Sequence, residues 1–254
     1  MSDGIAIRKC HRMEEFELCV ALQREIWEEA ELEVEPATLF VVAAHTGGQV
    51  LGAFDGERLV GYTLALAGVR EGGVPYLHSH MTGVQHAYRD RGVGRMLKLF
   101  QRDEALSRDI RLIRWTFDPL EFRNAFFNLN RLGAICRKYL PNLYGMTTSP
   151  LHRGLPTDRL LAEWQLDSPR VAVAAAGLAP QIPEFCVTID MPPGDMPPDH
   201  GTSTAPRQEK QAMASLQGRL REQFTRYFNR EYAAVAVRND PVGPAYLLCP
   251  WSDF

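Results

Sequence analysis

Changes in the spacing of hydrophobic residues divide the first part of the chain into distinct elements. Apolar and polar residues alternate at 5–9, which is typical of a short strand. Apolar residues then recur every three or four positions between Phe16 and Trp27, which predicts an amphipathic helix. A second helix is expected from Pro36 to Ala44, because proline is well tolerated in the first turn of a helix.

The next segments predict a hairpin, a long strand and a helix. Asp55-Gly56 stands between the apolar runs 50–54 and 59–64, and this dipeptide is a strong signal for a hairpin turn. A strand at 76–84 and a helix from about Gly92 to Ser107 follow. The residues of this helix that we expect in the core are Met96, Leu97, Phe100 and Ala105.

The pattern then alternates again and predicts a strand at 110–117. Asp118 and Pro119 are expected to act as N-cap and first residue of another helix, since these residue types suit those positions. Strands are expected at 139–146 and 159–166. The apolar residues expected on the helix that follows Asp118 are Phe122, Phe126, Leu129 and Cys136.

The tail differs in composition. Residues 191–206 include Pro192, Pro193, Pro197, Pro198 and Pro206, which indicates a loop or linker. Beyond this segment, one helix face is expected to carry Met213, Leu216, Leu220, Phe224 and Tyr227.

Strand-like segments at 185–190, 232–237 and 245–249 complete a small α+β unit with that helix. This unit is either a separate domain or an extension of the first sheet. The predicted parts are a domain over 1–168, a strand and linker over 169–206, and a C-terminal unit over 207–254.

Composition narrows the class of protein. The chain has 254 residues, of which 45% are hydrophobic and 23% charged, with a net charge of −3, so neither nucleic acid nor a membrane is an expected partner. The first four residues do not resemble a signal peptide. The five cysteines are scattered and odd in number, so we expect reduced thiols in a cytoplasmic protein.

The strongest motif is Arg89-Asp90-Arg91-Gly92-Val93-Gly94, which stands between a predicted strand and a predicted helix. Glycine lets the backbone approach a ligand, and the first amides of a helix bind anions. The motif lacks the Lys-Ser/Thr of a P-loop and the third glycine of a dinucleotide fingerprint. It therefore predicts a different phosphate-binding loop, with added charge from Arg89, Arg91 and Arg95.

An Arg-x-x-Gly-x-Gly loop with Val84 five residues before its arginine resembles the acyl-CoA pyrophosphate loop of the GNAT acyltransferase superfamily. The order of elements over roughly 5–166 is similar too. The resemblance implies an α+β fold with a mixed, mostly antiparallel sheet flanked by helices, and acetyl-CoA or another acyl-CoA as co-substrate. The cofactor-binding residues that it implies are Thr82, Gly83, Val84, Arg89, Arg91, Gly92, Val93, Gly94, Arg95 and Asn128.

His78 and His80 are the candidate catalytic residues. At a period of two, both imidazoles point to one face of their strand, and Val84 shares that face unless a bulge intervenes. An alkylamine is protonated at neutral pH, and histidine can accept its proton. The pair is similar to one in arylalkylamine N-acetyltransferases. Structural packing remains the alternative, and two histidines alone are too few ligands for zinc, so no metal is predicted.

The chain departs from the family where many GNATs carry a tyrosine as general acid, because Leu129 occupies that position. Either the CoA thiolate leaves without a general acid, or another tyrosine serves as that acid. The alternatives are Tyr88, Tyr139 and Tyr144. Asn128 and Asn130, on the same predicted helix, either contact cofactor or substrate or face solvent.

The expected function is direct transfer of an acyl group to a small primary amine or amino-acid-like acceptor, and a homodimer is compatible with the sequence. Arg153 and Arg159 are candidates for binding an acceptor carboxylate, and Trp115 and Trp164 for an apolar pocket, although structural roles are favoured. One alternative is a non-catalytic acyl-CoA-binding sensor. Chemistry located in the tail is a weaker one, since 207–254 contain no histidine.

Overall fold

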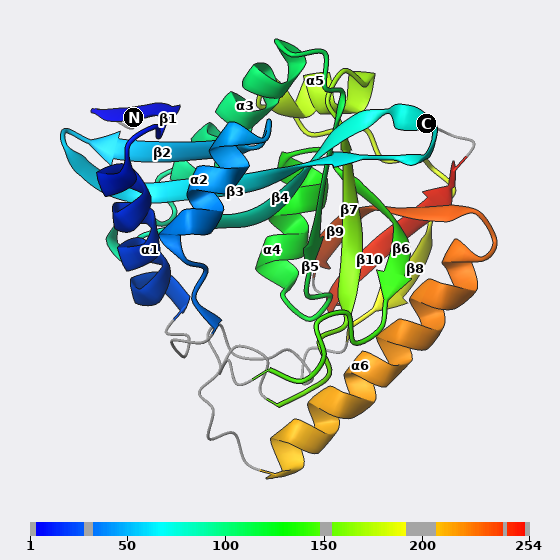
Figure 1. Cartoon of the computed structure of the whole chain (residues 1–254). Coiled ribbons are helices and arrows are strands. Elements are labelled where there is room, and N and C mark those ends of the chain that lie inside the picture. The colour runs from blue at the N-terminus through cyan, green and yellow to red at the C-terminus, as the bar shows by residue number, and fades with distance from the viewer. Residues whose placement is uncertain (1–3, 28–32, 148–153, 192–206, 241–242, 252–254) are drawn as a thin grey trace. The chain divides into compact units, whose positions relative to one another are not determined.

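A computed structural model describes residues 4–27, 33–147, 154–191, 207–240 and 243–251 (Figure 1). Most of the proline-rich segment, and Arg153, lie outside these residues. The chain forms two compact units, Met1–Trp115 and Thr116–Phe254, which are described separately. None of the helices in the described ranges is both long and apolar enough to span a membrane.

The first unit is built on a mixed sheet. Its strands lie in the order β1, β2, β3, β4 and β5, with antiparallel pairs from β1 to β4 and a parallel pair between β4 and β5. Their bounds are Ile5–Lys9, Gln49–Asp55, Arg58–Val69, Pro75–Val84 and Leu112–Phe117.

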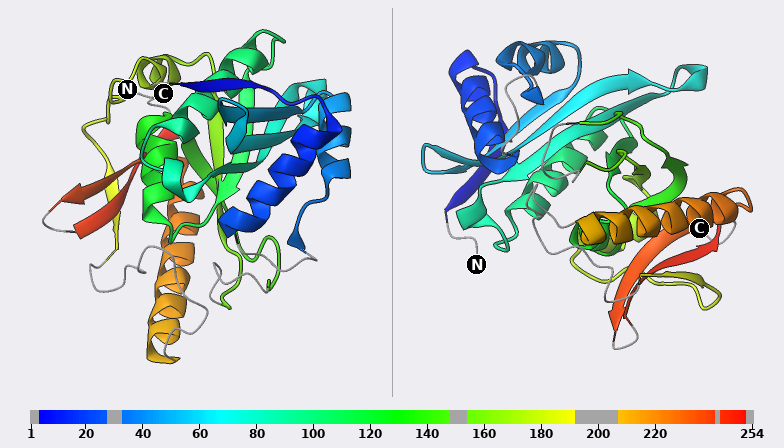
Figure 2. Two further views of the ribbon diagram at one scale, coloured as in Figure 1. Left: turned by 90° about the vertical axis from the view of Figure 1, so that its left-hand side faces the viewer. Right: turned by 90° about the horizontal axis from the view of Figure 1, so that it is seen from below.

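Helices cover both faces of this sheet (Figure 2). On one face α1 (Met13–Trp27) and α2 (Ala37–His45) bury Phe16 and Phe40 against Tyr62 of β3. On the other face α3 (Val93–Leu106) buries Leu97 against the strands. The alternating pattern of the strands and the three-to-four spacing of the helices therefore meet in two apolar layers.

The predicted hairpin is confirmed. Strands β2 and β3 are antiparallel, and Asp55 pairs with Arg58 across a two-residue turn. Gly56 has a φ of 61°, a conformation in which other residues pay a steric cost, so the glycine is required by the turn.

The second unit contains an antiparallel sheet with strands in the order β7, β6, β9, β10 and β8. Their bounds, in that order, are Arg159–Gln165, Ile135–Leu140, Tyr232–Asp240, Gly243–Pro250 and Val187–Asp190. The predicted tail hairpin is thus present, and its β9 pairs with β6 through Ala234 and Cys136. The predicted domain boundaries stay a prediction about which parts fold independently.

Helix α6 (Arg207–Phe228) follows the predicted pattern, whereas helix α5 (Pro169–Ala175) is not among the predicted elements and stands at the start of the range that was expected to hold only a strand and a linker. Helix α6 buries Phe224, whose ring stacks on Tyr139 at 5.8 Å and meets Tyr246 edge-on at 5.0 Å. Helix α5 begins after Ser168, whose side chain accepts a hydrogen bond from the N–H of Val171. That contact is a standard N-cap, with proline in the first turn.

The prediction that Asp118 and Pro119 begin a helix is wrong. The Asp118 carboxylate instead accepts the N–H of Leu120 in a turn, and α4 begins later, at Phe122–Phe126. A π-helical segment at Phe127–Arg131 (η4) follows. Gly133 then has a φ of 75°, which ends the helix, so the predicted helical residue Cys136 lies in β6 instead.

The strand predicted at 139–146 is also wrong beyond its first residues. Strand β6 ends at Leu140, and Asn142 and Gly145 adopt φ values of 46° and 75°. The backbone N–H of Asn142 donates to the Asp158 carboxylate at 2.9 Å. A turn held by a distant carboxylate therefore replaces the expected ladder.

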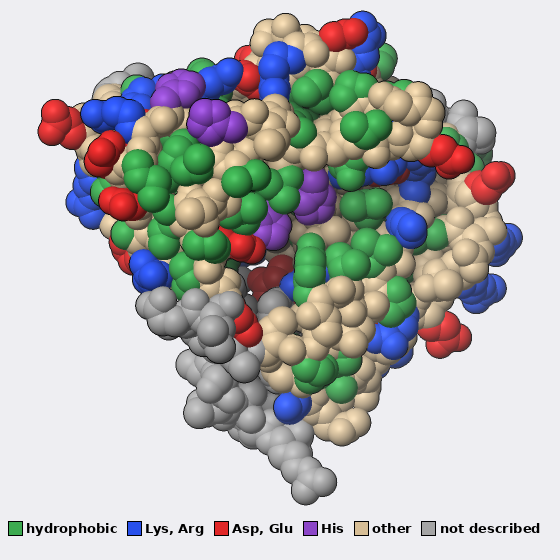
Figure 3. Space-filling view, viewed as in Figure 1, with side chains coloured by type: hydrophobic (Ala, Val, Ile, Leu, Met, Phe, Trp, Pro, Cys, Tyr) green, Lys and Arg blue, Asp and Glu red, His purple; other side chains and the backbone are tan. Residues whose placement is uncertain are grey.

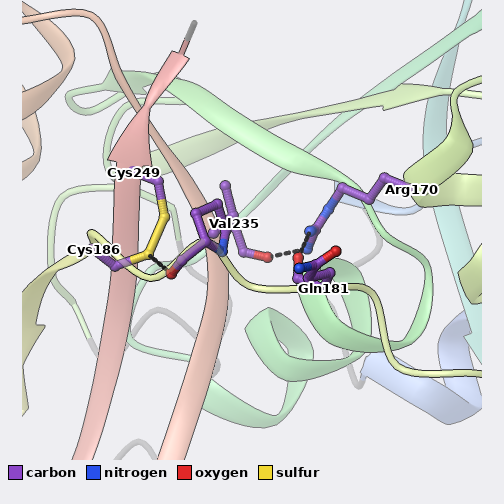
Figure 4. The surroundings of a disulfide bond; sticks show 6 residues. Arg170, Gln181, Cys186, Val235 and Cys249 are labelled. Atoms are coloured by element: carbon purple, nitrogen blue, oxygen red, sulfur yellow. Dashed lines mark hydrogen bonds between the residues drawn. A yellow bond between two sulfur atoms is a disulfide. The ribbon is translucent and has the colours of Figure 1, made fainter. Parts of the chain in front are cut away.

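The expectation of five reduced cysteines is wrong, because Cys186 and Cys249 form a disulfide (Figure 4). The two residues are 63 positions apart, which no spacing pattern could reveal. Strand pairing brings them together, since Val187 of β8 lies opposite Leu248 of β10. The free cysteines of the described residues, Cys10, Cys19 and Cys136, are buried.

Beside the disulfide, the half-buried Arg170 links several segments (Figure 4). The Arg170 guanidinium donates to the backbone oxygens of Gln181 at 3.1 Å, Leu129 at 3.3 Å and Val235 at 2.5 Å. Burial lowers the pKa of Arg170 to about 10, so the side chain keeps its charge at neutral pH. This charge joins α5, η4 and β9 of the second unit.

Candidate active site

A β-bulge in β4 determines where its histidines point. Ser79 lies opposite Ala65 of β3 and Met81 lies opposite Leu64, so His80 is an extra residue in the ladder. His78 and His80 share one face, with ring centroids 6.2 Å apart. Val84 packs on the opposite face, against the α3 layer, because the bulge intervenes between it and the histidines, which is the exception that the sequence analysis allowed.

His80 forms a dyad with a carboxylate that the sequence analysis missed. Its Nε2 lies 3.0 Å from Oε1 of Glu35, which precedes α2 and is 45 residues away in sequence. The side chains are 27% and 32% exposed, so both remain accessible to a ligand. In the described ranges, no three His, Cys, Asp or Glu side chains converge as metal ligands.

His78 is half-buried beside His80. Burial lowers its pKa, and the positive charges of His80 and Lys98 lower it further. The imidazole of His78 is therefore neutral at physiological pH and can accept a proton.

A second missed residue lies behind the histidines, on the α3 side of β4. Lys98 is buried, and its Nζ donates to Oγ of Ser79 at 2.7 Å and to Oε1 of Gln101 at 2.9 Å. The same ammonium lies 4.1 Å from the centroid of the Trp115 ring. Burial lowers the pKa of Lys98 to about 7. The hydrophobic pattern of α3 does not identify Lys98 as a candidate. The residue lies on the buried face of the helix, where that pattern predicts apolar core residues.

The glycine loop lies between β4 and α3, as predicted. After a short 3₁₀ turn (η3, His86–Tyr88), Asp90 and Gly92 adopt positive φ values of 59° and 81°. A Cβ built on Gly92 would meet no atom within 4 Å, so the backbone there is open to approach. Gly92 stands at the N-cap position of α3 and has no side chain with which to cap it, and the N–H groups of the first turn have no intrahelical acceptor.

The predicted arginines surround this loop in different environments. Arg91 is exposed, with its guanidinium 4.9 Å from the centroid of the Tyr88 ring. Arg89 is half-buried, and its Nε donates to the backbone oxygen of Val84 at 3.4 Å. Arg95 is half-buried in the first turn of α3. These charges add to the positive end of the helix.

Gly83 has a packing role rather than a bulge. A Cβ there would lie 2.7 Å from a ring carbon of Trp27 and 2.8 Å from Cδ1 of Ile26, so glycine is needed where the end of α1 approaches β4. The neighbouring Thr82 forms a hydrogen bond of 2.5 Å with Thr63 across the ladder. The bulge of β4 lies three residues earlier, at His80.

Strand β4 pairs with β5 only over Leu77 and His78, in the part of the chain that the structure describes. Beyond His78 the β5-facing backbone edge of β4 has no strand partner there. A strand edge of this kind can pair with an extended ligand through its N–H and C=O groups. The residues expected to contact pantetheine, Thr82 to Val84, lie on this stretch.

In the second unit, the two asparagines have distinct surroundings. Asn130 forms hydrogen bonds with both backbone groups of Val237, at 3.0 and 2.9 Å. The expectation that it contacts a ligand or faces solvent is therefore wrong, because it joins η4 to β9. Asn128 is buried and donates to Oδ1 of Asn124 at 3.2 Å, and its predicted cofactor contact stays a prediction.

The aromatic candidates of this unit are mostly structural. Leu129 is fully buried. Burial and a hydrogen bond to Asp158 raise the pKa of Tyr139 well above its usual range, which makes it a poor acid. Tyr144 bonds to Thr116 at 2.9 Å, and Trp164 is buried with its indole N–H donating to Leu132.

Arg159 is not an acceptor clamp. It is buried, donates to the backbone oxygen of Asp158 at 3.0 Å and lies 3.7 Å from the Asp118 carboxylate. The other predicted clamp residue, Arg153, lies outside the described residues.

No protein-family model and no curated protein sequence matches this chain. Solved structures do resemble it. A putative acetyltransferase of Salmonella typhimurium, yncA, solved with its cofactor acetyl-CoA, has a TM-score of 0.53 and 16% identity, covering 65% of this chain and 96% of its own. The ribosomal-protein-S18-alanine N-acetyltransferase of Escherichia coli has a TM-score of 0.52 and 11% identity, covering 65% and 95%.

A third similar structure is Arabidopsis thaliana Naa50 in complex with a CoA bisubstrate analogue, with a TM-score of 0.50 and 15% identity, covering 63% of this chain and 97% of its own. A putative acetyltransferase of the GNAT family from Desulfovibrio desulfuricans has a TM-score of 0.51 at 14% identity. The predicted α+β class, with a mixed and mostly antiparallel sheet flanked by helices, is confirmed. The chain therefore has the fold of the GNAT acetyltransferases.

Proposed function

We propose that this protein is an acyl-CoA-dependent N-acyltransferase that moves an acetyl or longer acyl group directly to a small primary amine or amino-acid-like acceptor. The observation that carries the proposal is the His80–Glu35 dyad, which lies on the strand that leads into the glycine loop. A base and an anion-binding helix terminus on one strand–loop–helix segment suit acyl transfer from a CoA thioester.

The co-substrate would bind along the segment from β4 to α3. Its diphosphate would meet the amides of the first turn of α3 and the charges of Arg89, Arg91 and Arg95, since helix N-termini and guanidinium groups both bind phosphate. Its pantetheine arm would pair with the strand edge from Thr82 to Val84. The thioester would then lie near the bulge.

The dyad gives His80 a defined protonation geometry. When Nε2–H donates to the Glu35 carboxylate, the lone pair of Nδ1 is left to accept a proton from the incoming ammonium. The neutral amine nitrogen then forms a bond with the thioester carbonyl carbon. The carbon–sulfur bond breaks, and sulfur leaves with the electron pair as CoA thiolate. The acylated nitrogen then gives its remaining extra proton to this thiolate, so that the products are the amide and the CoA thiol.

A non-catalytic acyl-CoA sensor is the second candidate. The observation that favours it is the fully buried Leu129, which stands where the resemblance places a general acid. A sensor would need the loop and the strand edge but neither histidine.

Turnover separates the two candidates. Thiol release from acetyl-CoA is measured with a panel of primary amines for the wild type, His80→Ala, His78→Ala and the exposed control His86→Ala. We expect His80→Ala to lower the rate about 10²- to 10⁴-fold. The loss should be largest below pH 8 and shrink as pH rises, because the free amine becomes abundant and needs no base.

A pH-independent loss in His80→Ala would contradict the base role. Tight CoA binding by the wild type, without turnover of any amine or acyl chain, would favour the sensor.

A further inference from the structure

The position of the bulge in β4 needs a physical cause. An extra residue interrupts the ladder, and moving it by one position along β4 would turn a different side chain towards Glu35. The face that carries His78 and His80 offers little to prevent this, since both imidazoles are only partly buried. The restraint therefore has to come from the residues that flank the bulge.

Both flanking polar residues are held on the opposite, α3-facing side of the strand. Before the bulge, Oγ of Ser79 accepts a hydrogen bond from Lys98 at 2.7 Å and lies 3.3 Å from Oε1 of Gln101. After the bulge, Thr82 bonds to Thr63 at 2.5 Å. A shift of the bulge would break one of these contacts, so together they define His80 as the extra residue.

Burying the charged side chain of Lys98 at this position costs free energy. A buried ammonium loses its hydration, and an apolar side chain of similar length would pack in the same place without that cost. The lowered pKa of Lys98 reflects this burial. Its contact with the Trp115 ring and its hydrogen bonds offset part of the cost but do not explain its presence.

We propose that Lys98, acting through Ser79, fixes the bulge that turns His80 towards Glu35, and is thereby a positioning residue for acyl transfer. The claim that Lys98 positions a residue for acyl transfer rests on the proposed function. The claim that Lys98 fixes the bulge does not, and it can be tested on the ligand-free protein.

The central variant is Lys98→Met, which removes the charge and the hydrogen-bond donor but keeps the length of the side chain. We expect kcat to fall about 10- to 100-fold with little change in KM for acetyl-CoA, because a misplaced base slows chemistry more than binding. The melting temperature should stay the same or rise. Arg102→Met is the matched control, since it removes a partly buried charge, paired with Asp103, one turn along the same helix.

Two further variants test the route through Ser79. Ser79→Ala should lower kcat as Lys98→Met does, and the double variant should be no worse than either single one, because both break the same contact. Ser79→Thr keeps a hydroxyl and should recover most of the loss. If Lys98→Met does not fold, Ser79→Ala carries the same test.

The readout that a merely structural role would not change is the NMR titration of the histidine imidazoles in the ligand-free protein. We expect the His80 signals to shift in Lys98→Met and Ser79→Ala but not in Arg102→Met. Unchanged His80 signals with wild-type kcat in both variants would overturn the inference. If the wild type turns over no acyl-CoA while the His80 signals still shift, the proposed function fails and the role of Lys98 in the bulge stands.

Discussion

Each unit contains a cluster of polar side chains around one carboxylate, and the two clusters differ in exposure and in the number of hydrogen bonds. In the first unit, Glu35 and His80 share one hydrogen bond, and both keep about a third of their surface exposed. In the second unit, Asp158 is fully buried. It accepts hydrogen bonds from Arg221 at 2.9 and 2.8 Å, from Tyr139 at 2.7 Å and from the N–H of Asn142 at 2.9 Å.

The difference lies in unused hydrogen-bonding capacity. A carboxylate accepts about four hydrogen bonds, and Asp158 has reached that number, so it can only hold its partners in place. A half-exposed dyad with one mutual hydrogen bond can exchange protons with a ligand. The number of hydrogen bonds that a carboxylate accepts, and its exposure, therefore distinguish a structural cluster from a candidate catalytic one in this protein better than residue type does.

The largest effect on ligand binding is expected at the amino end of α3. Gly94→Glu introduces a bulky negative charge where we propose that the diphosphate binds, so the Kd for CoA should rise about 100-fold or more, or about 2.7 kcal/mol. Isothermal titration calorimetry checks this. The matched control is Gly218→Glu on α6, where the space around the glycine is open. Equal CoA affinity in both variants would contradict the loop assignment.

The saturated cluster should respond in stability instead. Asp158→Asn removes the charge that Arg221 and Tyr139 share, so the free energy of unfolding should fall by about 3 kcal/mol. Urea denaturation followed by circular dichroism measures it. Glu222→Gln, an exposed change beside Arg221, is the control and should shift stability by less than about 0.5 kcal/mol. A stable Asp158→Asn protein would remove the distinction between the clusters.

The disulfide provides a third, covalent, restraint in the second unit. Reduction of Cys186–Cys249 should lower the free energy of unfolding by about 2–4 kcal/mol, since it releases a long closed loop in the unfolded chain. Thermal melts with and without dithiothreitol test this. In the double variant Cys186→Ser and Cys249→Ser, the reductant should have no further effect. A wild-type melt that is insensitive to reductant would refute the expectation.

The smallest effect is expected for Glu35→Gln. The amide keeps the shape but loses the charge that orients His80, so kcat should fall about 10-fold, or about 1.4 kcal/mol of activation free energy. Stability should change little, because the pair is half-exposed. Steady-state kinetics and a thermal melt measure the two together. A loss of stability without a loss of rate would assign Glu35 a structural role.

The face seen in Figure 3 shows, over its described residues, no broad field of one sign. Acidic and basic side chains are interspersed there. The arginines of the glycine loop are therefore a local feature of the strand–loop–helix segment, as their clustering in the sequence indicates.

The sequence by itself determined the features that depend on neighbouring residues. The Asp55-Gly56 turn, the glycine loop that opens α3 and the apolar face of α6 are local, because backbone conformation and periodicity are set within a few residues. Local pattern alone gave the wrong prediction at Asp118. Its side chain suits the start of a helix and a turn equally well, and the structure contains the turn.

Only the tertiary structure decided the features that join distant segments. Glu35 reaches His80 over 45 residues, Cys186 reaches Cys249 over 63, and Asn130 reaches the backbone of β9. The bulge at His80 also belongs here, because it depends on how β4 lies against β3 and α3 rather than on the residues of β4. Such contacts follow from strand pairing and helix packing, which depend on the whole chain, and so no local pattern announces them.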